Sequence, residues 1–203
     1  GLNTTGDENT AVGSFSLDAN TTGTQNTALG YQALSANTTS NNNVAVGFQS
    51  LLNNSTGTGN VGLGALSVDA NTTGSFNTGL GYNALTSNTT ANNNTAVGYY
   101  SLNANTTGTQ NTALGSSAGK ANTTGYNCVF IGDSAGASNT EGHHNTAIGR
   151  LALNENTTAD QNTAVGAEAL QKNTGDSNTA VGYQALDDKT TRQQNITIDP
   201  FAL

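Results

Sequence analysis

The stretch Asn26-Thr27-Ala28-Leu29-Gly30 carries the pattern that decides the fold. Variants of this block recur every 17 residues along the whole chain, except for one interval of 16 residues between Asn162 and Asn178. The blocks begin at Asn9, Asn26, Asn43, Asn60, Asn77, Asn94, Asn111, Cys128, Asn145, Asn162, Asn178 and Asn195. A unit this short cannot bury its own apolar side chains, so neighbouring units must stack on one another.

We interpret each unit as one coil and number its positions from the first residue of the block, which is position 1. Position 4 is always aliphatic, position 5 is Gly in eleven coils, and position 9 is Leu or Val apart from Gly119 and Gly136. Alternation on both sides of the Gly predicts two short strands, near positions 1–4 and 6–9. The Asn-Thr-Thr-Gly stretch that follows is typical of turns. The sequence therefore predicts an all-β protein, a parallel β-solenoid of about twelve 17-residue coils, with residues 1–203 as a single repeat domain.

Stacking turns each position of the coil into a ladder along the solenoid axis. We expect the aliphatic residues at position 4 and the leucines at position 9 to form a thin core. We expect the Asn side chains at positions 1 and 12 to form amide ladders. The small residues at positions 3 and 8 are expected to face outward and to let another chain approach closely.

Composition excludes several classes of function. The chain has 31 Asn and 34 Thr among 203 residues, only 9% charged residues and a net charge of −8. The scarcity of Lys and Arg argues against binding to nucleic acid. No apolar run approaches the roughly 20 residues needed to cross a bilayer, so no membrane insertion is expected. The single cysteine, Cys128, excludes an internal disulfide framework.

The two ends of the sequence fall in register with the repeat. Gly1 occupies position 10 of its coil and Leu203 occupies position 9. An unprotected β end is a template for pairing, so head-to-tail stacking through Gly1, Leu2, Phe201 and Leu203 is expected. The alternative is that the chain was cut from a longer repeat at a repeat boundary.

The block 26–34, with near copies at 77–85 and 178–186, resembles the repeats of phage tail-fibre proteins and of YadA-type trimeric adhesin heads. Those heads carry a similar Asn-x-Ala-aliphatic-Gly block and form trimeric left-handed β-rolls. The resemblance covers the whole chain. It implies an exported fibre or adhesive appendage, with a homotrimer as one possible assembly.

Residues that could support chemistry have simpler explanations within the repeat. The segments 115–119 and 132–136 match the G-x-S-x-G pattern of a nucleophile elbow, but they occupy positions 5–9, where Gly, Ser and Ala recur in other coils. His143 and His144 lie in a variable turn with only Glu141 nearby, which is too few ligands for a metal site. Cys128 is interpreted as filling a local change in packing. No catalytic residue, cofactor or metal is predicted.

Three surface features remain as candidates. Sequons at position 12 make N-glycosylation a possibility, although glycans on successive coils would stand only about 4.8 Å apart. The aromatic residues at position 6 could bind sugars. The Thr ladders at positions 13 and 14 suggest ice binding, which is the less favoured of these two functions. The glycosylation candidates are Asn20, Asn37, Asn71, Asn88, Asn105, Asn122 and Asn156, and the position-6 aromatics are Tyr31, Phe48, Tyr82, Tyr99 and Tyr183.

The sequence favours a non-enzymatic structural protein, a solenoid subunit of an extracellular filament or virion fibre that assembles through its ends. Its main partner would then be itself, as a homopolymer or a homotrimer. The alternative is a trimeric adhesin or tail-fibre head that binds a cell-surface glycan, and ice binding ranks third.

Overall fold

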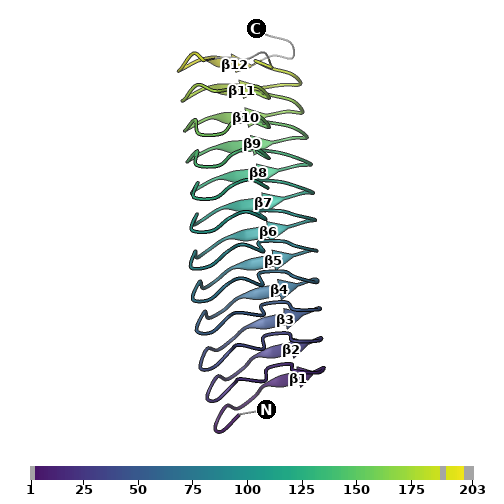
Figure 1. The fold of residues 1–203 in the computed structure, drawn as a ribbon. Helices are drawn as coiled ribbons and strands as arrows, with labels where there is room; N and C mark the ends of the chain where they lie inside the picture. Colours follow the sequence, from purple (N-terminus) through teal and green to yellow (C-terminus); the bar gives the residue numbers. More distant parts are fainter. Residues whose placement is uncertain (1–2, 188–190, 199–203) are drawn as a thin grey trace.

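The structure, a computed structural model, describes residues 3–187 and 191–198. Its coils stack into one rod, with the first strand at one end and the last at the other (Figure 1). Each coil contributes one strand of three residues, at positions 2–4, to a single twelve-stranded sheet in chain order. The strands are β1 (Thr10–Val12), β2 (Thr27–Leu29), β3 (Val44–Val46), β4 (Val61–Leu63), β5 (Thr78–Leu80), β6 (Thr95–Val97), β7 (Thr112–Leu114), β8 (Val129–Ile131), β9 (Thr146–Ile148), β10 (Thr163–Val165), β11 (Thr179–Val181) and β12 (Ile196–Ile198).

Every neighbouring pair of strands is parallel and in register with the repeat. Ala28 pairs with Ala11 on one side and with Ala45 on the other. The register holds across the short interval as well, because Ala164 pairs with Ala180, 16 residues later. The predicted all-β parallel solenoid is therefore confirmed, and equivalent positions do form ladders along the rod.

The second predicted strand is wrong, because positions 6–9 form a tight turn. The Gly at position 5 opens this turn with φ between 126° at Gly132 and 139° at Gly115. Positions 7 and 9 then adopt the left-handed conformation, as in Gln32 (φ 53°) and Leu34 (φ 52°). Left-handed backbone costs a non-Gly residue roughly 1–2 kcal/mol. Burial of a leucine at position 9 offsets that cost, since it contributes about 1.5–3 kcal/mol.

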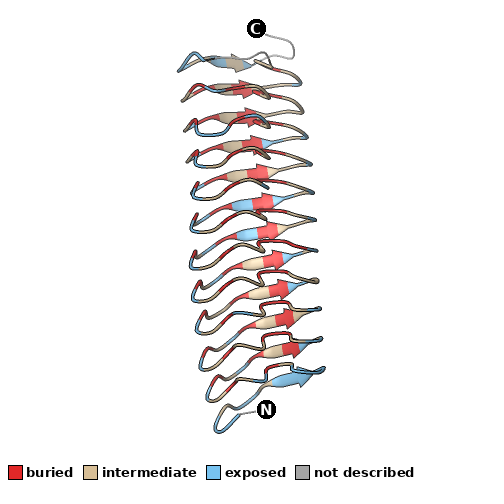
Figure 2. Cartoon of the chain, in the orientation of Figure 1, coloured by how far each residue is buried: buried red, intermediate tan, exposed pale blue. Residues whose placement is uncertain are grey.

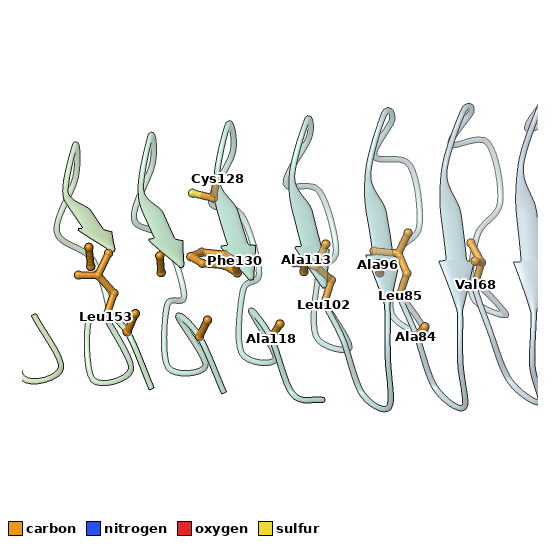
Figure 3. Packing of buried hydrophobic residues seen from close by; sticks show 14 of the residues in the cluster. Val68, Ala84, Leu85, Ala96, Leu102, Ala113, Ala118, Cys128, Phe130 and Leu153 are labelled. Carbon is orange, nitrogen blue, oxygen red and sulfur yellow. The ribbon is translucent and has the colours of Figure 1, made fainter. Parts of the chain in front are cut away.

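The expected division between core and surface is correct only in part. The leucines at position 9 are buried as predicted, but the aliphatic residues at position 4 face outward: Leu114, for example, is 48% exposed. The Ala residues at positions 3 and 8, expected outside, are buried, as at Ala113 and Ala118. Figure 2 shows the buried residue between two less buried ones in most strands, and Figure 3 shows the small interior side chains beside the leucines.

The physical reason is that strict alternation ends at the turn. Strand residues alternate, so positions 2 and 4 share the outer side while position 3 points inward. The left-handed residues at positions 7 and 9 then turn two consecutive side chains, such as Ala33 and Leu34, into the interior. With three inward apolar side chains per coil beside the buried asparagines, only small residues at two of them leave room for the leucine.

The predicted Asn ladders are confirmed, and they carry much of the polar interior. At position 12, the Nδ2 of Asn105 donates to the Oδ1 of Asn88 over 3.0 Å and to the carbonyl oxygen of Gly108 over 2.9 Å. The Nδ2 of Asn122 donates in turn to the Oδ1 of Asn105. The same link between neighbouring coils repeats from Asn156 back to Asn3.

The ladder at position 1 works differently, because it accepts from the backbone. The Oδ1 of Asn94 accepts the backbone N–H of Asn111 in the next coil over 3.0 Å. The Nδ2 of Asn94 donates to the Gly108 carbonyl in its own coil over 2.8 Å. Both Asn side chains of a coil therefore converge on the carbonyl at position 15, which closes the turn.

The shortened coil breaks this network at one place. Its Asn173 donates to the Gly175 carbonyl, two residues away instead of three. Two buried polar atoms next to the deletion, the Oδ1 of Asn156 and the Nδ2 of Asn162, have no hydrogen-bond partner. An unsatisfied buried group costs about 1–3 kcal/mol. The 17-residue period is therefore set by the amide network as well as by the turns.

Candidate functional site

The outward residues at positions 2 and 4 make one face of the sheet, which we name the outer sheet face. All twelve position-2 residues are Thr, Val or Ile, and all twelve position-4 residues are Val, Leu or Ile. The face therefore carries no charged side chain along its full length. Seven of the twelve position-4 residues are exposed, from 37% at Ile148 to 56% at Val12 and 73% at Ile198 in the last strand, and the other five are partly buried.

A row of aromatic rings at positions 6 and 7 borders this face. Tyr31 and Phe48 stack with centroids 5.6 Å apart, and Phe15 meets Tyr31 edge-on at 6.0 Å. All three rings are about half exposed. We name the position-4 ladder together with this aromatic row the apolar stripe.

A second aromatic cluster continues the row further along the rod. Tyr82 and Tyr99 stack at 5.9 Å with their planes 14° apart, and Tyr100 lies 4.4 Å from Tyr99. The Nζ of Lys120 lies 5.5 Å from the centre of the Tyr100 ring. Because these rings stack on one another along the axis, they turn their faces largely toward each other and their edges toward solvent. Sugar binding by aromatic residues uses ring faces, so this arrangement weakens the glycan hypothesis.

The seven asparagines predicted as glycosylation sites all lie in the interior. The side chains of Asn20, Asn37, Asn71, Asn88, Asn105, Asn122 and Asn156 are 0–1% exposed. Their Nδ2 atoms, to which a glycan would be joined, instead donate hydrogen bonds within the position-12 ladder. The folded coil has no room for a glycan on these side chains, which corrects the glycosylation prediction.

The two G-x-S-x-G segments make room for an oversized core residue. Phe130 stands at position 3, where most coils have Ala, and its ring is fully buried. A Cβ placed on Gly119 in the preceding coil would lie 2.6 Å from the Phe130 ring, and one on Gly136 in the same coil would lie closer still. Both glycines have φ near 58°, the left-handed value of position 9. The motifs are therefore complementary packing around Phe130, and the described chain has no helix after either of them as a nucleophile elbow would need.

Cys128 takes the place of an asparagine in the position-1 ladder. Its Sγ donates to the Gly142 carbonyl over 3.3 Å, which is the bond that an Asn Nδ2 makes in other coils. The thiol is buried, and burial raises its pKa to about 11, although the backbone N–H of Asn145 partly opposes the shift. A protonated, enclosed thiol is poorly reactive, so the packing interpretation of Cys128 fits the structure.

His143 and His144 lie beside Tyr126 and form an aromatic cluster. The ring of His143 stacks on Tyr126 with centroids 4.0 Å apart, and His144 meets the same ring edge-on at 5.2 Å. The backbone N–H of His143 donates to the Oδ1 of Asp160 over 2.7 Å. Within residues 3–187 and 191–198, no group of three or more His, Cys, Asp or Glu residues is arranged to hold a metal ion.

The Thr ladders divide into an internal and an external one. The hydroxyl of Thr106 at position 13 donates to the carbonyl of Thr123 in the next coil over 3.1 Å. At position 14, Thr107 is exposed, and so are its counterparts in most coils. Only this second ladder is free to order water, and its next outward neighbour, position 16, varies among Thr, Asn, Ser, Tyr, His, Asp and Gln.

The four residues predicted as assembly ends, Gly1, Leu2, Phe201 and Leu203, lie outside the described residues. None of the described residues forms a helix long and apolar enough to span a membrane.

The packing role of the glycines can be tested with a double-mutant cycle at Phe130 and Gly136. Phe130→Ala leaves a cavity that costs about 3–5 kcal/mol, and Gly136→Leu overpacks the core by about 1–3 kcal/mol. We expect the double variant to be more stable than the sum of the two losses predicts, because it restores the common Ala and Leu pair. Urea unfolding gives the three free energies of unfolding, and strictly additive losses would contradict this role.

The buried thiol predicts a pH dependence of stability. The folded-state pKa of Cys128 lies above the ordinary thiol value of 9.0, so the unfolded chain ionises first and the contribution of the thiol to stability declines as pH rises from about 9 to 11. The loss is at most about 1.4 kcal/mol for each pH unit. In Cys128→Asn and Cys128→Ser we expect a shallower decline, measured by urea unfolding between pH 8 and 10.5. An unchanged slope in both variants would show that the thiol does not cause it.

Comparisons with protein-family models, curated proteins and solved structures found no match to this chain.

Proposed function

We propose that the chain is a structural subunit of an extracellular fibre, in which solenoid rods stack end to end along their common axis. The observation that carries the proposal is the directional bonding between coils. The backbone N–H at position 2 donates to the following coil, as from Thr179 to the Asn195 carbonyl over 2.8 Å. The N–H at position 5 donates to the preceding coil, as from Gly30 to the Val12 carbonyl over 2.8 Å.

The first and last described strands each have backbone groups with no neighbouring described strand to bond to. In β12, the N–H of Ile196 has no following strand, and next to β1 the N–H of Gly13 has no preceding one within residues 3–187 and 191–198. The two edges are complementary, because each offers the groups that the other needs. An open strand edge of this kind recruits another chain.

The bonding inside the rod supports a mechanical role, because it links successive coils to one another. The sheet joins every described coil to its neighbours, and two Asn ladders and the Thr hydroxyls of position 13 join most of them. The Asn- and Thr-rich, weakly charged composition and the resemblance to fibre and adhesin repeats support an extracellular location.

A glycan-binding adhesin or tail-fibre head is the second candidate. The exposed rings of Tyr31, Phe48, Tyr82, Tyr99 and Tyr183 favour it. The stacking of Tyr31 on Phe48 and of Tyr82 on Tyr99 makes it the weaker one, because it covers ring faces that a sugar would need, and we therefore rank assembly above recognition.

End-to-end stacking can be tested at β12. Ile196→Pro removes the outward N–H without touching the bonds to β11, since proline is tolerated on the open side of an edge strand. We expect native chains to form filaments in the electron microscope with a rise near 4.8 Å between strands, and the Pro variant to form short rods only. Ile196→Ala keeps the N–H and is the matched control, which should still polymerise. Filaments of equal length from all three proteins would contradict the proposal.

A further inference from the structure

Three of the six tyrosines of the chain lie together at one place on the rod, which we name the tyrosine cluster. Tyr82 belongs to the coil of β5, and Tyr99 and Tyr100 belong to the coil of β6. The ring centroid of Tyr82 lies 5.9 Å from that of Tyr99 and 6.0 Å from that of Tyr100. We propose that the cluster is a site of oxidative cross-linking, where a peroxidase-type oxidant joins Tyr82 to Tyr99 by a carbon–carbon bond.

The backbone holds Tyr82 and Tyr99 side by side. Leu80 pairs with Val97 in the sheet, and each tyrosine follows its strand by two residues. The backbone N–H of Tyr100 donates to the Tyr82 carbonyl over 3.1 Å. The planes of the two stacked rings are 14° apart, and their centroid separation lies within the range of about 4.5–7 Å that is typical of aromatic pairs. Because the two phenols are neighbours before any reaction, coupling within one chain is favoured over coupling between chains.

Both rings are open to an oxidant in solution. Tyr82 is 47% exposed and Tyr99 is 56% exposed. Exposed side chains change rotamer rapidly, so the ring carbons ortho to the two hydroxyls can meet without movement of the backbone. Tyr100 is more buried, and the Nζ of Lys120 lies 5.5 Å from its ring centre. A positive charge at that place opposes removal of an electron from Tyr100, which favours Tyr82 and Tyr99 as the reacting pair.

The composition of the chain directs oxidation to tyrosine. Cysteine and methionine are the side chains that most often consume an oxidant, and the indole of tryptophan is the other aromatic ring that gives up an electron readily. The chain contains no Met and no Trp, and its one cysteine, Cys128, is buried. The exposed phenols are therefore the electron donors that an external oxidant meets first.

The other tyrosines have different surroundings. Tyr31 stacks on Phe48, and Tyr126 stacks on His143. Tyr183 follows a coil that has Ala167 at position 6. Only the coils of β5 and β6 have tyrosine at position 6 in succession, so a cross-link within one chain is expected at the tyrosine cluster.

The reaction balances with hydrogen peroxide as the electron acceptor. The oxidant removes one electron and one proton from each phenol hydroxyl and leaves two phenoxyl radicals. The radicals form a carbon–carbon bond between ring positions ortho to the oxygens, and the hydrogen on each bonded carbon then moves to the oxygen and restores the phenol. The two electrons and two protons pass to one molecule of hydrogen peroxide, which becomes two molecules of water.

The product ties two coils together covalently in the middle of the rod. The bond closes a loop between residues 17 apart in the sequence, and a closed loop restricts the unfolded chain as a disulfide does. All the reacting atoms belong to one chain, so the cross-link goes beyond the proposed end-to-end stacking and does not depend on it.

The test treats the folded chain with a haem peroxidase and hydrogen peroxide. Denaturing gel electrophoresis separates the monomer of 20.4 kDa from cross-linked dimers, and the blue fluorescence of dityrosine is measured in the monomer band. Tyr82→Phe removes the phenol that the coil of β5 contributes. Tyr31→Phe is the matched control, because it replaces a position-6 tyrosine that stacks on phenylalanine. Circular dichroism verifies that both variants keep the fold.

We expect dityrosine fluorescence in the monomer of the native chain and of Tyr31→Phe, and its loss in Tyr82→Phe. Mass spectrometry of the native monomer should show the loss of two hydrogen atoms and, after thermolysin digestion, a peptide that joins Tyr82 to Tyr99. The cross-linked monomer should also unfold at a higher urea concentration than the untreated one. A monomer without fluorescence, equal fluorescence in Tyr82→Phe, or fluorescence confined to dimers would overturn the proposal, and an unchanged urea midpoint would contradict the stabilising role of the bond.

Discussion

The rest of the structure depends on the asparagine amides inside each coil. A 17-residue loop encloses too little apolar volume to close on hydrophobic contacts alone, since its interior holds mainly two small residues and one leucine. The amides at positions 1 and 12 fill the remaining interior and satisfy the carbonyl at position 15, as Asn94 and Asn105 do at Gly108. Because each amide also binds the next coil, closing one coil and stacking two coils depend on the same groups.

This constraint explains why the repeat tolerates few exceptions. Where Cys128 replaces an asparagine, a thiol takes over the bond to the position-15 carbonyl of Gly142. Where one residue is missing, buried amide atoms of Asn156 and Asn162 lose their partners. Phe130 is accepted only with glycine at two neighbouring position-9 sites. Each exception is compensated nearby or leaves an identifiable defect.

The period, the parallel register and the Asn ladders could be predicted from the sequence, because a strict repeat forces equivalent residues into contact. The side of the sheet that is buried could not. Alternation implied that Leu29 and Leu34 share the interior, but the left-handed backbone at Gln32 and Leu34 reorients the coil and leaves Leu29 at the surface. Nothing in a Leu-to-Leu spacing reveals that a leucine will adopt φ near 52°. The exposed position-4 ladder of the apolar stripe is the consequence of this difference.

The most direct test of the amide network is the stability of Asn105→Ala. The substitution removes two donated bonds and the acceptor of Asn122, so the free energy of unfolding measured in urea should fall by about 3 kcal/mol or more, given 1–3 kcal/mol for each buried group left unpaired. Thr107→Ala, on the exposed ladder two residues away, should change it by less than about 0.5 kcal/mol. Equal, small losses in both variants would contradict the claim that the asparagine ladders hold the solenoid together.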